Sequence, residues 1–189
     1  MRIIGGNFRG THLAPVGEGG SRAHLRPTSD RVREAIFNLL INGRLDGGPD
    51  PVAGARVLDL FAGTGALGLE ALSRGATHLT LVDDGKAAVA LIRRNIEITR
   101  TTAAQVLRQN ATTLGRSPGA PFSLIFLDPP YGKALGEAAL AAASAGNWIA
   151  PGAVIVWEES TAPLVPSGFS RLDQRSYGDT QITILRAAQ

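Results

Sequence analysis

The sequence predicts a doubly wound α/β fold, and three observations support it. Residues 57–68, VLDLFAGTGALG, combine a short apolar strand, a turn with glycines spaced G-x-G-x-x-G and the start of a helix. After this stretch, strand patterns alternate with helical patterns, which is typical of a parallel sheet covered by helices. Near the end of the chain, two strand patterns meet at a tight turn, so they are expected to pair antiparallel. The fold is therefore expected to be Rossmann-like and mostly parallel, with a C-terminal antiparallel strand pair.

A small extension precedes the predicted sheet. Residues 1–6 and 10–15 predict a hairpin, and Thr28 or Ser29 is suited to cap a helix that follows it. The apolar face of that helix is expected to carry Val32, Ile36, Leu39 and Leu40. A stretch rich in glycine and proline then marks a linker. Within a single domain, we therefore expect an N-terminal hairpin and helix over 1–41, a linker over 42–54 and a core over 55–189.

Each core element has its own pattern. A glycine at position 75 ends the first core helix, because glycine readily adopts the backbone conformation of a helix C-terminus. The strands are expected at 56–61, 77–82, 103–107, 122–127 and 153–157, the helices at 66–74, 86–98 and 134–145, and the final hairpin at 170–177 and 180–185.

Composition excludes several classes of protein. The chain has 189 residues, 44% of them hydrophobic and 19% charged, which suits one soluble domain with a sizeable core. Its apolar runs are too short for a membrane helix or a signal peptide, so we expect a cytoplasmic protein with no membrane partner. It has no cysteine and only three histidines, which excludes disulfides and cysteine-ligated zinc and predicts that no metal is bound.

Positive charge is concentrated at the start of the chain. The whole chain has a net charge of +3, whereas residues 1–33 alone hold six arginines and two acidic residues. Arginine is suited to phosphate and base contacts, so this part is predicted to bind nucleic acid. A solvated basic arm with no partner stays open as an alternative. On the helix, Arg33 is expected to point toward the partner together with Arg31, and the residues expected to contact the nucleic acid are Arg9, Arg22, Arg26 and Arg31.

Two carboxylates beside the glycine turn indicate which ligand the turn receives. Asp83 follows the second strand, 18 residues after Gly65, where a carboxylate can accept both hydroxyls of a ribose. Asp59 lies four residues before Gly63 and would repel the pyrophosphate of a dinucleotide. It suits the ammonium and sulfonium groups of S-adenosylmethionine instead. A methyltransferase is therefore favoured, while an NAD-type oxidoreductase and an ordinary strand-turn-helix corner stay open.

A second motif, DPPY at residues 128–131, directly follows the apolar strand 122–127. Ligands of open α/β sheets bind beyond the carboxyl ends of the strands, so this motif should border the same crevice as the glycine turn. The Asp128 carboxylate and the Pro129 carbonyl can accept the two N–H groups of an exocyclic amine, and Tyr131 can stack on its base. Holding an amine next to a reactive sulfonium supplies much of the catalysis, because well-oriented reactions gain about 7 to 11 kcal/mol.

These motifs resemble those of class I S-adenosylmethionine-dependent methyltransferases that modify planar nitrogens. The stretches RIIGGNFRG, LRPTSDRVREAIFNLL and GALGLEALSRGA look like the RsmD family of bacterial 16S rRNA guanine-N2 methyltransferases. The resemblance runs from Met1 to about Leu185. It implies that the cofactor is S-adenosylmethionine and that the partner is 16S rRNA, free or in a small-subunit assembly particle. We expect the protein to act as a monomer.

The resemblance also implies roles for individual residues. The methionine arm would lie beside Asp59, Phe61, Gly63 and Gly65, the ribose beside Asp83 and the adenine beside Asn110. In the family a glutamate usually stands where this chain has Asp83, so either Asp83 or Asp84 is expected to contact the ribose. The predicted catalytic residues are Asp128, Pro129, Pro130 and Tyr131. The predicted cofactor-binding residues are Thr28, Asp59, Phe61, Ala62, Gly63, Gly65, Asp83, Asn110 and Ala111.

The predicted function is transfer of a methyl group to the exocyclic N2 of a guanine in 16S rRNA. Adenine or cytosine in DNA and glutamine in proteins also present a nitrogen conjugated to a planar group. These substrates stay open as alternatives, and so does an RNA-binding module without catalytic activity. Guanines in unpaired loops, or splayed out of the stack, are the accessible targets.

Overall fold

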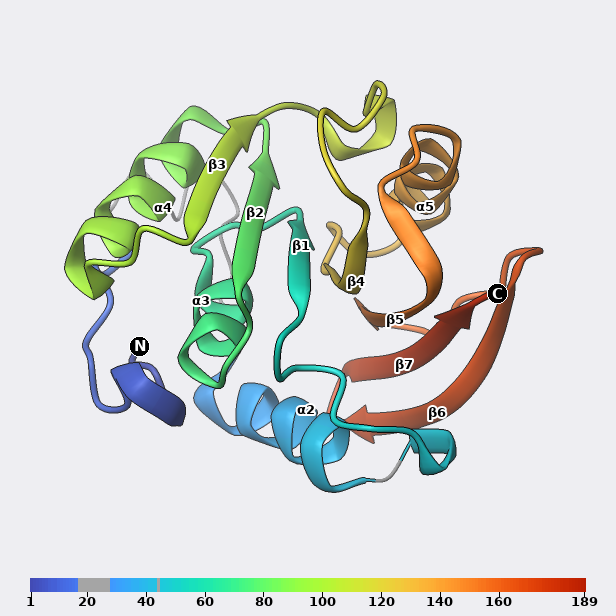
Figure 1. The fold of residues 1–189 in the computed structure, drawn as a ribbon, viewed down its shortest axis with the longest axis horizontal. Coiled ribbons are helices and arrows are strands. Elements are labelled where there is room, and N and C mark those ends of the chain that lie inside the picture. Colours follow the sequence, from blue (N-terminus) through green and yellow to red (C-terminus); the bar gives the residue numbers. More distant parts are fainter. Residues whose placement is uncertain (17–27, 44) are drawn as a thin grey trace.

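Seven strands of the described residues form one sheet in the order β3-β2-β1-β4-β5-β7-β6 (Figure 1). The structure is a computed structural model that describes residues 1–16, 28–43 and 45–189. The first five strands in this order are parallel, and β7 and β6 continue the sheet in antiparallel pairing. The strands are β1 (Arg56–Leu60), β2 (His78–Asp83), β3 (Ala104–Arg108), β4 (Phe122–Leu127), β5 (Ile149–Glu159), β6 (Phe169–Tyr177) and β7 (Thr180–Ala187).

Helices cover both faces of this sheet, as the alternation of side chains along the strands requires. Val57 of β1 belongs to a core cluster shared with α2, α3 and α4, whereas its neighbour Leu58 belongs to a second cluster shared with α5. The order in which successive strands are added to the sheet reverses between β1 and β4, which makes this point the topological switch of the sheet. The helices are α2 (Asp30–Asn42), α3 (Ala66–Ser73), α4 (Lys86–Thr99) and α5 (Leu135–Ala145).

The predicted fold class is confirmed, including the antiparallel pair at the C-terminus. One strand differs clearly from the prediction, because β5 extends beyond 153–157 at both ends. Its first residue, Ile149, pairs with Phe122 of β4, and its last residue, Glu159, pairs with Gln181 of β7. These partners lie far away in sequence, so local pattern could not place the ends of the strand.

The N-terminal segment, residues 1–16, is folded onto the core. The expected hairpin is reduced to one antiparallel bridge between Arg2 and His12, with a short 3-10 helix at Gly6–Phe8 between its arms. The amide of Ile3 donates to the Thr11 carbonyl at 3.0 Å, and Ile3 itself is fully buried in the core. The segment is therefore part of the domain.

Two buried polar side chains hold the N-terminal segment. The Glu70 carboxylate of α3 accepts the amides of Ile4 and Gly5, both at 2.8 Å. The Asn95 side-chain oxygen of α4 accepts the amide of Ala14 at 2.8 Å. Because Glu70 and Asn95 are fully buried, these bonds are sheltered from water and fix the path of the segment over α3 and α4.

The expectation that Arg33 points toward a partner is wrong, since Arg33 is fully buried. Its guanidinium donates to the Arg2 carbonyl at 2.6 Å and to the Asp30 carboxylate at 2.9 Å. The backbone of the N-terminal segment lies over this side of α2 and removes it from water. Burial also lowers the pKa of Arg33, against the attraction of Asp30 and Glu70. The predicted start of the helix is confirmed, with Ser29 as its cap.

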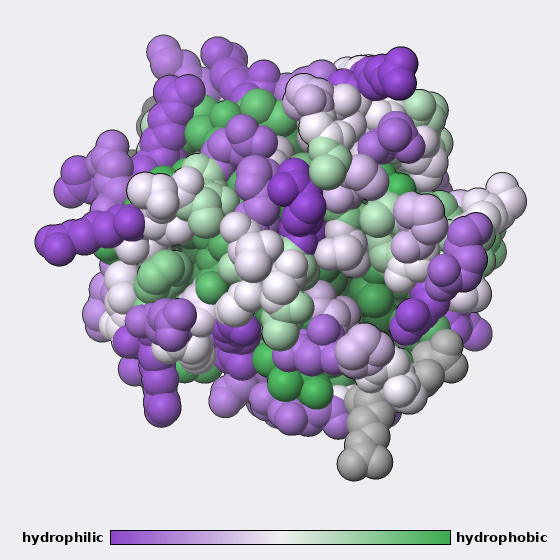
Figure 2. All heavy atoms as spheres, viewed as in Figure 1, coloured by the Kyte–Doolittle hydropathy of each residue, from purple (hydrophilic) through white to green (hydrophobic). Residues whose placement is uncertain are grey.

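The surface has hydrophilic side chains around separate apolar recesses on the face seen in Figure 2. Within the described ranges, Leu164 and Val165 are the exposed large hydrophobic residues, and both lie in the loop between β5 and β6. None of the helices built from described residues is long and apolar enough to cross a membrane.

Candidate active site

The register of the parallel strands aligns acidic residues at one edge of the sheet. Leu60 of β1 pairs with Val82 on one side and with Leu127 on the other. Leu127 pairs in turn with Trp157 of β5. The next residue along each of the four strands therefore falls in a single row at their carboxyl ends, and these residues are Phe61, Asp83, Asp128 and Glu158.

This row borders a cavity of about 880 Å³, a size typical of small-molecule sites. The cavity walls come from the turn between β1 and α3, the end of β2, the DPPY motif, the start of α2 and the tip of the β6–β7 hairpin. Most of the predicted site residues line it, namely Thr28, Asp59, Phe61, Ala62, Gly63, Asp83, Asp128, Pro129, Pro130 and Tyr131. The ribose candidates Asp83 and Asp84 both line it as well.

Three predicted cofactor-binding residues do not line the cavity. Gly65 starts α3 in the left-handed conformation, with a φ of 75°, and a Cβ there would lie 2.9 Å from Leu81. The turn and the packing of the helix therefore require a glycine at position 65. Asn110 caps the turn after β3, where its side-chain oxygen accepts the Thr112 amide at 2.9 Å. Ala111 is buried within the same turn.

The glycine turn is held in place by hydrogen bonds from neighbouring elements. The Asp83 carboxylate accepts the amides of Gly63 and Gly85, both at 2.9 Å, and so ties the turn to the end of β2. The Asn95 side chain donates to the Thr64 carbonyl at 2.8 Å, so the residue that holds the N-terminal segment also holds the turn. Burial raises the pKa of Asp83, although both amide bonds oppose the shift.

Asp59 is a buried carboxyl group at the floor of the turn, and its side chain is only 2% exposed. It accepts the Gly68 amide at 3.0 Å, and a Cβ at Gly68 would lie 3.0 Å from the same oxygen, so glycine permits this approach. Burial raises the pKa of Asp59 to about 8; the Gly68 bond opposes this shift and the nearby Asp83 adds to it. A cation beside Asp59 would favour its ionised form, and the ammonium of S-adenosylmethionine is such a cation.

The other half of the cavity is built around Asp128. Burial raises the pKa of Asp128 well above its ordinary value, and the charges of Glu158 and Asp59 add to the shift. The Thr28 hydroxyl, at 3.4 Å from the Asp128 carboxylate, opposes it. Tyr131 donates its hydroxyl to Glu158 at 2.9 Å, which fixes the ring at the cavity wall.

The chain is similar to known proteins over most of its length. Residues 1–186 match the model of a family described as conserved hypothetical protein 95. The chain is 38% identical over 173 residues to ribosomal RNA small subunit methyltransferase D of Escherichia coli, covering 90% of this chain and 81% of that protein. The chain belongs to the RsmD family. It is also 34% identical to the Haemophilus influenzae protein of the same name, over 94% of this chain and 89% of the relative.

A solved structure supports the same assignment. The Escherichia coli protein yhhF superposes on this chain with a TM-score of 0.83 at 35% identity, covering 100% of this chain and 99% of that one. As a member of the RsmD family, the chain is a methyltransferase, and its cofactor is S-adenosylmethionine. The buried Asp59, the left-handed glycine turn and Asp83 fit this cofactor, because they offer a carboxylate to its ammonium and another to its ribose.

The sequence prediction missed every residue of this RsmD-family site that follows the DPPY motif in the chain, and the lining residues there are Glu158, Tyr177, Asp179 and Thr180. Glu158 had a signal, because it directly follows the predicted strand 153–157 just as Asp128 follows β4. The other three lie at the tip of the β6–β7 hairpin, and only the antiparallel pairing with β5 brings that tip to the cavity.

The predicted RNA-contacting arginines lie in different places. Arg9 is exposed beside the turn of the N-terminal segment. Arg31 is exposed in the first turn of α2, next to Ser29 and Val32, which line the cavity. Arg22 and Arg26 lie outside the described residues. In the part of the chain that the structure describes, no group of three or more acidic, histidine or cysteine side chains could hold a metal ion.

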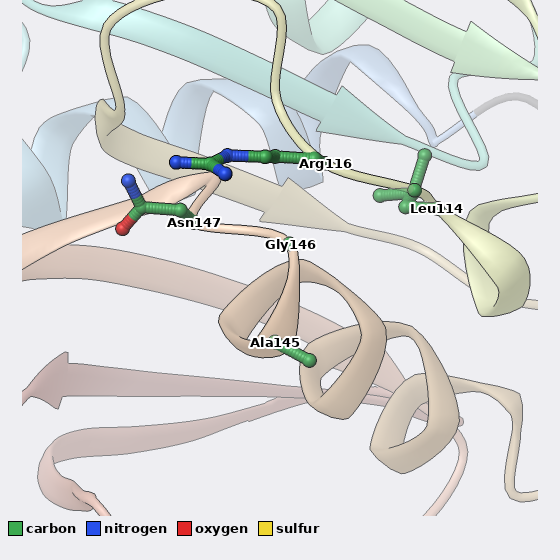
Figure 3. Close-up of a pocket in the computed structure, with 6 residues that line it drawn as sticks. Leu114, Arg116, Ala145, Gly146 and Asn147 are labelled. Carbon is green, nitrogen blue, oxygen red and sulfur yellow. The ribbon is translucent and has the colours of Figure 1, made fainter.

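A second hollow lies between the loop before β4 and the C-terminal end of α5 (Figure 3). Two hydrogen bonds of 2.7 Å join the two segments that line it, from Trp148 to the Gly115 carbonyl and from the Ser117 amide to the Gly146 carbonyl. Its lining residues include none of the predicted site residues and no acidic side chain. The chemistry of the molecule is therefore assigned to the larger cavity.

Proposed function

We propose that this protein transfers a methyl group from S-adenosylmethionine to the exocyclic N2 of a guanine in 16S rRNA. The observation that carries the proposal is that one cavity joins the glycine turn with Asp59 to the DPPY motif at the end of β4. The relatives named ribosomal RNA small subunit methyltransferase D support the ribosomal substrate.

In this proposal the first half of the cavity holds the cofactor. Asp59 receives the ammonium group, and the carboxylate of Asp83 or Asp84 receives the ribose hydroxyls. The backbone of Phe61, Ala62 and Gly63 faces the methionine arm. Gly65 supports the turn. Asn110 and Ala111 lie outside the cavity lining, and we assign their turn after β3 to the adenine side of the cofactor site. When bound, S-adenosylmethionine supplies a methyl group carried on a positively charged sulfur.

The second half holds the target amine. Asp128 accepts one N–H of the guanine amine, and the Pro129 carbonyl accepts the other, while Pro130 keeps this corner rigid. The Asp128 carboxylate then takes the proton that the amine loses. Its raised pKa suits this task, because a carboxylate with a higher pKa binds a proton more tightly. Tyr131 lies at the wall where it can stack on the base.

The N-terminal part contributes the RNA contacts. We assign this role to the extension over 1–41, followed by the linker 42–54 and the methyltransferase core 55–189. Arg9 and Arg31 are exposed and available to phosphates, and Arg31 stands near the cavity mouth. Arg22 and Arg26 belong to the same basic stretch of sequence. The RNA substrate is 16S rRNA, either free or in a small-subunit assembly particle.

The proposal is tested by transfer of labelled methyl from S-adenosylmethionine to unmodified small-subunit particles. Wild-type protein should label the rRNA, and Asp128→Ala should abolish labelling while cofactor binding persists. Glu137→Ala is the matched control, since Glu137 is an exposed carboxylate in the first turn of α5 and does not line the cavity. Transfer that survives in Asp128→Ala, or label that enters protein instead of RNA, would contradict the proposal.

A further inference from the structure

Glu158 is a buried carboxylate of the cavity to which the proposed chemistry gives no role. It lies near the end of β5, in the same row as Asp128, and is only 6% exposed. Burying a charged group is costly unless its oxygens are satisfied by hydrogen bonds. The partners of this carboxylate therefore indicate what it does.

Each oxygen of Glu158 meets a residue of the target half. Oε1 accepts the Tyr131 hydroxyl at 2.9 Å, and Oε2 accepts the Thr28 hydroxyl at 3.1 Å. The same Thr28 oxygen lies 3.4 Å from Oδ2 of Asp128, so this hydroxyl stands between the two carboxylates. The Tyr131 hydroxyl also lies 3.3 Å from the hydroxyl of Thr180, at the start of β7. One side chain thus links the chain before α2, the DPPY motif and the hairpin.

The charge of Glu158 acts on both Asp128 and Tyr131. Charged and polar side chains face Asp128 from β1 (Asp59), from β5 (Glu158 and Glu159) and from the segment that precedes α2 (Thr28). After burial itself, Glu158 contributes most to the raised pKa of Asp128. Burial and the nearby Glu158 also raise the pKa of Tyr131, against the Thr180 hydrogen bond, so Tyr131 keeps its proton and remains a donor to Glu158.

We propose that Glu158 is a positioning residue of the methyl-transfer site, which fixes the Tyr131 ring directly and the Asp128 carboxyl group through Thr28. This inference rests on the proposed function for the roles of Asp128 and Tyr131. The arrangement holds the stacking surface and the amine acceptor at a fixed separation before the base enters. It also makes Asp128 a stronger base than burial alone would make it.

Two substitutions with opposite expected effects test the proposal. Glu158→Gln removes a negative charge near Asp128, so the pKa of Asp128 should fall. Thr28→Val removes the hydrogen bond that opposes the shift, so the pKa of Asp128 should rise. Glu159→Gln is the matched control, because Glu159 is the adjacent buried carboxylate, contacts the backbone of Gly132 and contributes least to the shift.

The first readout is the ¹³C chemical shift of the Asp128 carboxyl carbon as a function of pH, measured on the full chain. It requires no substrate, so it is independent of which nucleoside is methylated. A lower midpoint in Glu158→Gln and a higher one in Thr28→Val would support the proposal. Midpoints that stay at the wild-type value in both variants would overturn it. Thr28→Val keeps the test decisive if Glu158→Gln fails to fold.

The second readout is methyl transfer, with kcat and KM measured separately across pH. Glu158→Gln should lower kcat about 10-fold to 100-fold, because a small misplacement of reacting groups is costly. The acid limb of its pH profile should move to lower pH, while its KM for S-adenosylmethionine stays unchanged. A loss of activity equal to that of Glu159→Gln, with no movement of the acid limb, would overturn the positioning role. Wild-type protein that methylates another nucleoside would instead refute the proposed function.

Discussion

The replacement Asp59→Asn tests the electrostatics of the cofactor half without a ligand. Asparagine has nearly the same shape as aspartate, and its side-chain oxygen can still accept the Gly68 amide, which lies 3.0 Å from the native carboxylate. The substitution removes only the ionisable group. Any change in the pH dependence of stability therefore reports on Asp59.

The size of the effect follows from the pKa of this group. Folding raises the pKa of Asp59 from 3.8 to about 8. The folded protein therefore retains a proton that the unfolded chain releases, and the unfolding free energy falls as the pH rises through this window. A shift of roughly four units corresponds to about 5 kcal/mol, which is an upper limit. Above about pH 8 the contribution of Asp59 should level off.

The assay is urea unfolding at several pH values between 4 and 9, followed by tryptophan fluorescence. Both tryptophans of the chain, Trp148 and Trp157, are buried, so their emission should report unfolding. Asp59→Asn should match the wild type near pH 4 and become progressively more stable than it toward pH 9. Val57→Ala, at a fully buried neighbour on β1, is the control that changes packing but no charge, and its cost should not vary with pH. A stability difference between wild type and Asp59→Asn that is flat across pH would show that folding does not raise the pKa of Asp59.

Three further predictions concern other parts of the molecule. Glu70→Gln should lower the unfolding free energy by about 3 kcal/mol and expose residues 1–16 to proteolysis. The reason is that a buried carboxylate that accepts two amides of this segment loses its charge. Unchanged stability and unchanged protection from proteolysis would contradict this prediction. Gly136→Ala should destabilise the protein by about 1 to 3 kcal/mol in the same urea assay, because the new Cβ would overlap the Trp157 ring. A gain in stability would show that α5 tolerates the extra methyl group. In a filter-binding titration, Arg31→Ala should weaken rRNA binding and reduce its salt dependence by about one counterion. Arg33→Met, at a buried position, should leave the salt dependence of binding unchanged. Equal salt slopes in the wild type and both variants would exclude a phosphate contact of Arg31.

The order and type of the core elements could be predicted because local chemistry marks them. The glycines at 63, 65 and 68 mark the turn and the start of α3, and Gly178 marks the final hairpin, where it adopts a φ of 61°. The apolar run before the DPPY motif placed β4 at Phe122–Leu127, the bounds found in the structure. These signals lie within a few residues of the feature that they predict.

The errors and omissions arise from contacts that are distant in sequence. Arg33 was expected to be exposed because it is charged, but the backbone at Arg2 covers it. Tyr177 and Asp179 reach the cavity only because β7 pairs with β5. Glu158 directly follows a predicted strand, as Asp128 does, but it belongs to no recognisable motif. For Arg33, Tyr177 and Asp179, neither local pattern nor motif spacing contains the information that places them.

The most direct test of the whole account is identification of the methylated nucleoside. Unmodified small-subunit particles are incubated with wild-type protein and labelled S-adenosylmethionine, and the rRNA is then digested to nucleosides and separated by chromatography with mass detection. If the protein is a guanine-N2 methyltransferase, the label is found in N2-methylguanosine and Asp128→Ala gives none. Label in N6-methyladenosine or N4-methylcytosine would contradict the account, although the cavity would still be a methyl-transfer site.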